Sequence, residues 1–170
     1  MKRTTGFTIV ELLIVIVVIG ILAAISIVAY NNVAAKARDS QRKQDLSNIA
    51  KALHMYKVNH GDMVLSGSGS GGAGNGWFNV RYSSGLQSMA QLLVSSGELS
   101  AELVDPINYT SSCGPTGQPC RAYMKYTCSL GTYLYASLES EPSGHDGPTN
   151  NTCAPTWDTA YNMNYVIKVE

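Results

Sequence analysis

The chain carries a long apolar pattern close to its N-terminus. No residue from Leu12 to Ala35 is charged. As a helix, these 24 residues extend about 36 Å, which exceeds the roughly 30 Å hydrocarbon core of a bilayer. The pattern therefore predicts a membrane-spanning helix in this part of the chain.

A second apolar pattern follows with helical spacing. Leu46, Ile49, Leu53 and Tyr56 recur three and four residues apart, which is typical of a helix with one buried face. Gly61 is a natural stop for such a helix. We therefore expect one helix of about 54 residues, from Phe7 to His60, about 80 Å long, whose second half packs on a globular head.

The remaining patterns predict a small antiparallel sheet. Residues 121–128 and 132–139 alternate between the two faces of a strand, and "SLG" joins them as a hairpin. Residues 163–170 could add a third strand. Residues 86–100 fit a short amphipathic helix that stops at Gly97. The expected fold class is α+β, with a long helix packed against a small antiparallel sheet.

Composition divides the chain into four parts. Residues 1–6 precede a hydrophobic helix expected over 7–34, and these are followed by the second half of that helix over 35–60 and a head over 61–170. A glycine- and serine-rich stretch at 65–76 is expected to be a flexible surface loop. It lacks the G-K-[ST] of a phosphate-binding loop, so a nucleotide site is not predicted there.

Charge is unevenly distributed although the formal net charge is zero. Residues 31–60 carry six basic side chains against two acidic ones, whereas residues 61–170 carry nine acids and four bases. A basic middle segment suits membrane headgroups, nucleic acid or an acidic protein surface. The simpler interpretation, which we favour at this point, is a solvated helix face.

Four cysteines lie in the last third of the chain: Cys113, Cys120, Cys128 and Cys153. An even number beyond a membrane segment suggests two disulfides in an oxidising compartment. Of the three possible connectivities, we favour Cys113–Cys120 and Cys128–Cys153. No pair has C-x-x-C spacing, which disfavours a zinc or redox motif.

Lys2 and Arg3 precede the apolar run, so the positive-inside rule predicts an N-terminus in the cytoplasm. The rest of the chain then lies outside, in agreement with the cysteines. The run is too long for a cleaved secretory signal. Simple anchoring leaves Glu11 unexplained, because carboxylates in spanning helices are rare and usually functional.

The segment "KRTTGFTIVELL" resembles the class III signal of type IV pilins and pseudopilins. The resemblance is close from Lys2 to Tyr30. It implies that a membrane peptidase cleaves between Gly6 and Phe7 on the cytoplasmic side and then N-methylates Phe7. The apolar segment is retained, which distinguishes this signal from a secretory one.

The resemblance also assigns a role to Glu11 in assembly. In a bundle of staggered helices, Glu11 of one subunit can neutralise the Phe7 amine of another; pairing within one subunit is the alternative. Removing one partner of a buried ion pair costs about 3–5 kcal/mol, so Glu11 would fix the register of the subunits. The other implied partners are further pilins, an inner-membrane platform protein and a cytoplasmic assembly ATPase.

Neither a cofactor nor an enzymatic activity is predicted. Three histidines have no evident nucleophile or paired acid beside them, and His54 and His60 fall on different helix faces. Asp146, Asn150 and Asn151 are weak candidates for calcium, because their spacing is not that of an EF-hand. Ordinary turn chemistry is the favoured explanation for these residues.

The function expected from the resemblance is that of a structural subunit of a type IV pilus-like surface filament, used for adhesion, twitching motility or DNA uptake. The subunit would lie in the cytoplasmic membrane before assembly and outside the cell afterwards. The alternatives are a pseudopilin of type II secretion, a membrane-anchored surface binding module that does not polymerise, and a minor pilin that captures DNA through the basic segment or contacts a host surface.

Overall fold

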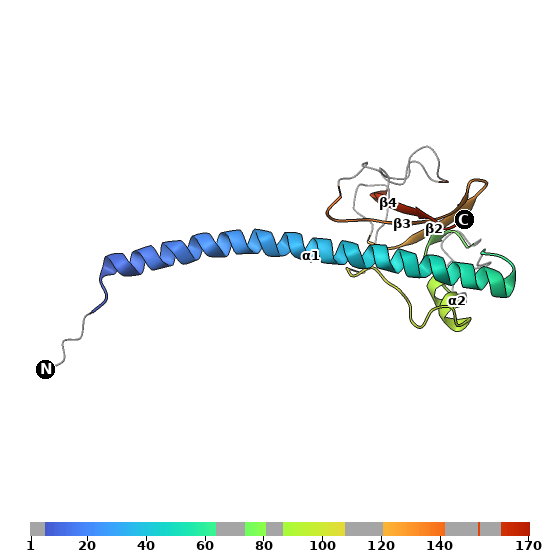
Figure 1. Cartoon of the computed structure of the whole chain (residues 1–170), viewed down its shortest axis with the longest axis horizontal. Coiled ribbons are helices and arrows are strands. Elements are labelled where there is room, and N and C mark those ends of the chain that lie inside the picture. The colour runs from blue at the N-terminus through green and yellow to red at the C-terminus, as the bar shows by residue number, and fades with distance from the viewer. Residues whose placement is uncertain (1–5, 64–73, 81–86, 108–120, 142–152, 154–160) are drawn as a thin grey trace. The chain divides into compact units, whose positions relative to one another are not determined.

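A computed structural model describes residues 6–63, 74–80, 87–107, 121–141, 153 and 161–170. The chain divides into two compact units, Met1–Ala37 and Arg38–Glu170. The first unit holds the N-terminal part of helix α1 (Ile9–His60), and the second holds the rest of α1 with the head (Figure 1). The expected α+β class is confirmed.

Helix α1 is a single element of 52 residues. It begins two residues later than expected, because Thr8 acts as its cap. It ends at His60, and the next residue, Gly61, has a φ of +86°. The Gly61 N–H donates to the Lys57 carbonyl at 2.7 Å, which satisfies one of the carbonyls left free at a helix end.

The sheet has four antiparallel strands in the order β1-β2-β3-β4. They are β1 (Gly76–Trp77), β2 (Met124–Cys128), β3 (Gly131–Ala136) and β4 (Tyr165–Lys168). The β2–β3 hairpin and the strand at β4 are confirmed. Strand β1 was not predicted, since its two residues are too few to show an alternating pattern.

The main core lies around the C-terminal half of α1. Leu46, Ile49 and Leu53 are fully buried, which confirms the predicted apolar stripe. The sheet and the short helix α2 (Met89–Ser95) lie on different sides of this part of α1 (Figure 1). Ser88 and Gln91 form a capping box that starts α2.

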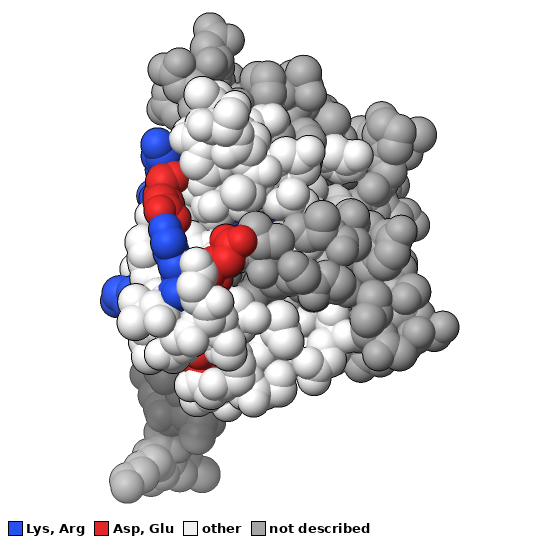
Figure 2. Space-filling view, turned by 90° about the vertical axis from the view of Figure 1, so that its right-hand side faces the viewer, with Lys and Arg blue, Asp and Glu red and all other residues white. Residues whose placement is uncertain are grey.

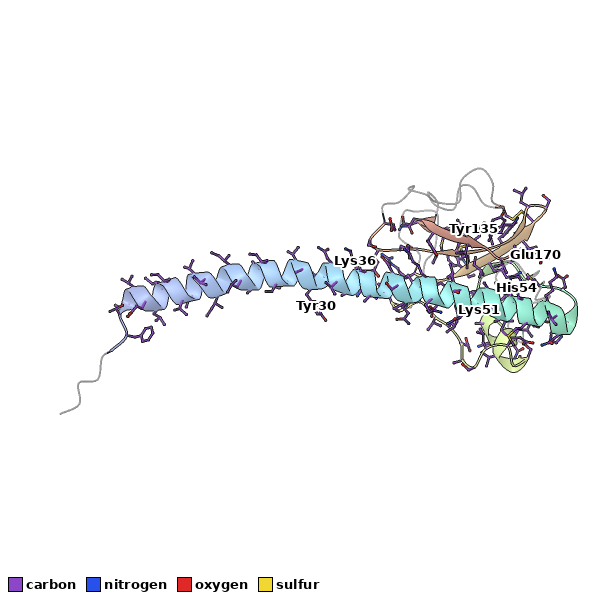
Figure 3. All side chains as sticks on the ribbon, viewed as in Figure 1. Tyr30, Lys36, Lys51, His54, Tyr135 and Glu170 are labelled. Carbon is purple, nitrogen blue, oxygen red and sulfur yellow. A yellow bond between two sulfur atoms is a disulfide. The ribbon has the colours of Figure 1, made fainter. Side chains whose placement is uncertain are left out.

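The sheet buries side chains on both faces. Leu134 and Ala136 face the main core, whereas Tyr133 and Tyr135 belong to a second cluster with Met124 and Met163. Tyr135 lies within the sheet in Figure 3. The alternation along β3 explains why a strand buried almost throughout still follows a period of two.

The β2–β3 turn depends on Gly131. Its φ is +130°, and a Cβ built there would lie 2.0 Å from the Glu170 carbonyl oxygen. We expect Gly131→Ala to lower the free energy of unfolding by about 2–4 kcal/mol, because backbone strain adds to overpacking. Thermal denaturation of the purified full chain in detergent measures the loss.

Gly97→Ala is the matched control for this substitution. Gly97 also has a positive φ, +90°, but its added Cβ would meet nothing within 4 Å. Strain alone predicts a loss of about 1–2 kcal/mol. Equal losses for the two variants would contradict the steric role of Gly131.

Candidate functional site

The start of α1 is fixed by Thr8 and Glu11. Glu11 Oε2 accepts hydrogen bonds from the Thr8 backbone N at 2.8 Å and from Thr8 Oγ1 at 2.6 Å. In return, the Glu11 backbone N donates to Thr8 Oγ1 at 3.3 Å. This is a capping box, in which two residues three apart satisfy the free N–H groups of a helix start.

The two residues before the cap are open to their surroundings. Phe7 is 80% exposed, and neither Gly6 nor Phe7 is helical. A Cβ placed on Gly6 would meet nothing within 4 Å, and its φ is not one that favours glycine. The fold of this chain therefore sets no requirement for glycine at position 6.

The apolar surface of the first unit is uncovered. Large aliphatic side chains from Ile9 to Val33 are 45% to 79% exposed, and they project on every side of α1 (Figure 3). By length and composition, α1 is able to cross a membrane, with a mean hydropathy of 3.3 in its most apolar window. So large an apolar surface is not stable in water and needs either lipid or protein to cover it.

Near the end of this surface the side chains are small. Ala24 and Ala29 leave a shallow hollow that is also lined by Ile25, Val28 and Asn32. Small side chains permit the close approach of another helix. The surface of the first unit is therefore uneven enough to accept side chains from a neighbour.

The second unit contains a buried cluster of charges around Arg42, whose side chain has no exposed surface. Arg42 Nε and Nη2 donate to the two carboxylate oxygens of Asp105 at 2.6 and 3.0 Å. Its Nη1 donates to Asp39 at 2.8 Å and to Glu139 at 2.6 Å. Arg38 adds two further bonds to Glu139, at 2.8 and 2.6 Å. We call these five residues the Arg42 network.

Asp39 ties the same network to the segment that follows β3. Its oxygens accept from the backbone N–H groups of Glu139 and Ser140, each at 2.8 Å, and from Ser140 Oγ at 2.6 Å. Asp105 accepts from the Ile107 N–H at 2.9 Å. The network thus joins α1 to two segments that lie 63 to 101 residues further along the chain.

These contacts shift the ionisation of Glu139. Hydrogen bonding from Arg38, assisted by Arg42, lowers the pKa of the Glu139 carboxyl to about 2. Its side chain is 14% exposed, so solvent screens these bonds only in part. The carboxylate form is therefore favoured throughout the neutral range.

Two more polar side chains are buried in the head. Tyr123 donates its hydroxyl proton to Asp45 at 2.6 Å, and burial followed by this bond raises the pKa of Tyr123. Lys125 Nζ donates to the Gly74 carbonyl at 2.9 Å and to Thr127 Oγ1 at 3.2 Å. Burial lowers the pKa of Lys125 to about 8.

These contacts correct the expectation of a solvated basic helix face at Arg42, whereas Lys36, Lys43 and Lys51 are exposed as expected. Arg42 is inside the head, Arg38 is paired with Glu139, and Lys57 is paired with Glu170. Lys43 lies 5.3 Å above the Tyr165 ring. Figure 2 shows a face on which basic and acidic side chains alternate in one narrow band, with most of the described surface uncharged.

Cys128 and Cys153 form a disulfide with their Cα atoms 5.7 Å apart, which is the pairing that the sequence favoured. Cys113 and Cys120 lie outside the described residues, as do the calcium candidates Asp146, Asn150 and Asn151.

Histidines and acidic residues do not gather into a metal site in the described part of the chain. No group of three such side chains or cysteines is positioned there to hold an ion. His54 lies along α1 near Lys51 (Figure 3). His60 stacks on Tyr56, with ring centres 4.1 Å apart.

Residues 1–27 match the family described as the prokaryotic N-terminal methylation motif. The chain is 34% identical over 77 residues to a fimbrial protein of Neisseria meningitidis, which is 45% of each chain. It is 36% identical over 59 residues to type II secretion system core protein G of Pseudomonas aeruginosa, which is 35% of this chain and 42% of the relative. The chain therefore carries a prokaryotic N-terminal methylation motif, and its N-terminal part is similar to type IV pilins and to a type II secretion core protein.

A third relative is prepilin peptidase-dependent protein D of Escherichia coli, 36% identical over 72 residues, or 42% of this chain and 49% of the relative. The chain thus spans about half the length of the relatives that it matches, and no solved structure matches it significantly. The similarity to pilins and pseudopilins therefore rests on the methylation motif and on these partial matches.

Two features of this chain were not predicted from its sequence. Thr8 and Glu11 have the T-x-x-E spacing of a capping box directly before an apolar run, so that signal was present in the sequence. The burial of Arg42 had no comparable local signal, because its partners Asp105 and Glu139 are distant in the chain.

The low pKa of Glu139 predicts how stability depends on pH. A carboxyl whose folded pKa is depressed stabilises the fold above its unfolded pKa and loses this contribution as pH falls through its folded pKa. Glu139→Gln should therefore lower the free energy of unfolding by up to about 3 kcal/mol at pH 7. The difference from the wild type should shrink from about pH 4.5 down to pH 2.

Chemical denaturation at a series of pH values, followed by tryptophan fluorescence, measures this difference. Glu102→Gln makes the same change at an exposed carboxylate and should leave stability nearly unaffected. A Glu139→Gln loss that stays constant down to pH 2 would show that its charge is not what stabilises the head.

Proposed function

We propose that this chain is the precursor of a structural subunit that polymerises through the N-terminal part of α1 into a type IV pilus-like filament. The observation that carries the proposal is the uncovered apolar surface of the first unit, most of which lies within the methylation motif at residues 1–27. Other copies of the chain can cover that surface in the filament, and lipid can cover it before assembly.

In this proposal the precursor is inserted with Lys2 and Arg3 in the cytoplasm. A prepilin peptidase cleaves between Gly6 and Phe7 and methylates the new Phe7 amine. The bond lies before the helix start, in residues that are exposed and not helical. A peptidase needs that kind of access to a backbone.

Glu11 is the proposed assembly residue. Thr8 occupies only one oxygen of its carboxylate, Oε2. Among the described residues nothing donates to Oε1, so this oxygen is available to a cation. After cleavage, the Phe7 amine of a neighbouring subunit supplies such a cation, and the pair fixes the stagger between subunits.

Lipid and sister helices both remove the same surface from water, so burial alone does not drive a subunit out of the membrane. We therefore infer that assembly needs an external energy source. By resemblance to type IV pilins, that source would be a cytoplasmic ATPase acting through a platform protein. The proposed role is structural, as the name of the fimbrial relative suggests.

The second candidate is a pseudopilin, which the match to type II secretion system core protein G favours. A pseudopilin would form a short filament and its loss would stop protein export. A pilin would form long surface filaments and its loss would leave export intact. Electron microscopy of sheared material together with an export assay in a deletion strain separates the two.

Processing is tested by mass spectrometry of the N-terminal peptide of the mature chain. We expect N-methyl-Phe7 in the wild type. Gly6→Val should block cleavage while leaving the head intact, because an added side chain at position 6 meets nothing in the chain itself. A wild-type chain that keeps residues 1–6 in cells containing the peptidase would refute processing at this bond.

Assembly is tested with Glu11→Gln, which keeps the shape of the side chain and removes its charge. Cleavage and methylation should continue, whereas filament yield should fall at least about 100-fold, because the Phe7 amine is left unpaired in an apolar bundle. Glu102→Gln is the control and should assemble normally. Filaments of normal yield from Glu11→Gln would contradict the assembly role.

A further inference from the structure

The Arg42 network lies where the chain enters the second unit. That unit begins at Arg38, and Arg38, Asp39 and Arg42 occupy the first turns of α1 within it. The apolar residues of α1 that pack in the core, from Leu46 to Leu53, come afterwards along the chain. A force transmitted along α1 from its N-terminal part therefore meets the charged network before it meets the apolar core.

Thermal stability alone does not explain this arrangement. Well-packed apolar residues in place of a buried ion cluster are often neutral or even stabilising. Here one guanidinium without exposed surface is surrounded by three carboxylates, all within 3.0 Å. Burying such a cluster has a large desolvation cost. Its presence therefore suggests that it provides a property that apolar packing would not provide.

Directional bonding is such a property. Hydrogen bonds weaken steeply once distance and angle change, whereas apolar side chains keep much of their contact when they slide past one another. Arg42 holds Asp105 through two parallel bonds and Glu139 through a third. Asp39 in turn holds Glu139 and Ser140 by their backbone N–H groups. Displacement of α1 along its axis would strain all of these bonds together.

We propose that the Arg42 network is a mechanical clamp, which transmits tension from α1 to the head and protects the apolar core from being sheared. The purpose of the clamp rests on the proposed function, since only a polymerised subunit carries tension along α1. The partners of the clamp are the segment around Asp105 and the segment after β3 that begins at Leu138.

The clamp is tested by pulling single molecules of the full-length chain in detergent. One handle is fused before Met1, and the other is attached to an azide-bearing amino acid at position 130. Leu130 is 49% exposed and lies in the turn between β2 and β3, outside the network. The load then enters the head through α1 and leaves it through the sheet.

Arg42→Met is compared with a Leu53 variant, Leu53→Val or Leu53→Ala, chosen for an equal loss of stability in denaturant. Leu53 is fully buried in the apolar core, so this pair separates the network from the core. At constant load, Arg42→Met should unfold about 100-fold faster than the wild type, whereas the Leu53 variant should unfold less than about 10-fold faster. Arg42→Lys, which keeps the charge and loses the paired bonds, should fall between Arg42→Met and the wild type.

Equal acceleration of the Arg42 and Leu53 variants would overturn the proposal, because it would show that the network contributes to stability alone. If Arg42→Met does not fold, Glu139→Gln provides the same comparison. The result is independent of polymerisation. If Arg42→Met unfolds much faster under load but the chain forms no filaments, the proposed function is refuted and the clamp stands. If the chain forms filaments but the Arg42 and Leu53 variants are accelerated equally, only the clamp is refuted.

Discussion

The constraint on which the structure depends is that a single helix has to satisfy two different environments. The N-terminal part of α1 exposes aliphatic side chains that water does not tolerate, and its C-terminal part buries Leu46, Ile49 and Leu53 in the head. No break in α1 separates the two parts. The two parts of the helix therefore differ in their side chains and not in their backbone. The side chains become polar and charged from Asn31 onward.

Two charges of this helix, one beside the apolar run and one in the head, are each held by specific partners. Glu11 is held by Thr8 at the start of the apolar run, and Arg42 is held by three carboxylates in the head. An unpaired charge in either place would be strongly destabilising. The difference is that Arg42 finds its partners within the chain, whereas one carboxylate oxygen of Glu11 accepts no hydrogen bond from the residues that the structure describes.

Local patterns were sufficient to predict most of the fold. The stripe of Leu46, Ile49 and Leu53 and the β2–β3 hairpin were predicted because periodicity is a property of neighbouring residues. The capping box at Thr8 was equally local and could have been found. Burial of Lys125 and Arg42 could not, because both side chains look like solvated charges until distant segments close around them.

The candidate functional residues also differ in whether the sequence alone could identify them. Gly6, Phe7 and Glu11, the proposed processing and assembly residues, are recognisable from sequence because they lie together in one short motif. In the basic segment Arg42 looks like a surface charge in the sequence although its side chain is buried in the head, whereas Arg38 stays partly exposed in its pair with Glu139. A count of basic residues measures potential for nucleic-acid binding only when those residues are unpaired and exposed.

The position of the buried charges also suits the proposed role as a filament subunit. Thermal unfolding disrupts all contacts of the head together, and burial of apolar side chains stabilises the head against it. Tension along α1 instead concentrates on the contacts nearest to its point of entry, which here are those of Arg38, Asp39 and Arg42. Short, directional bonds to Asp105 and Glu139 suit that place, because they resist a small displacement before the core behind them is disturbed.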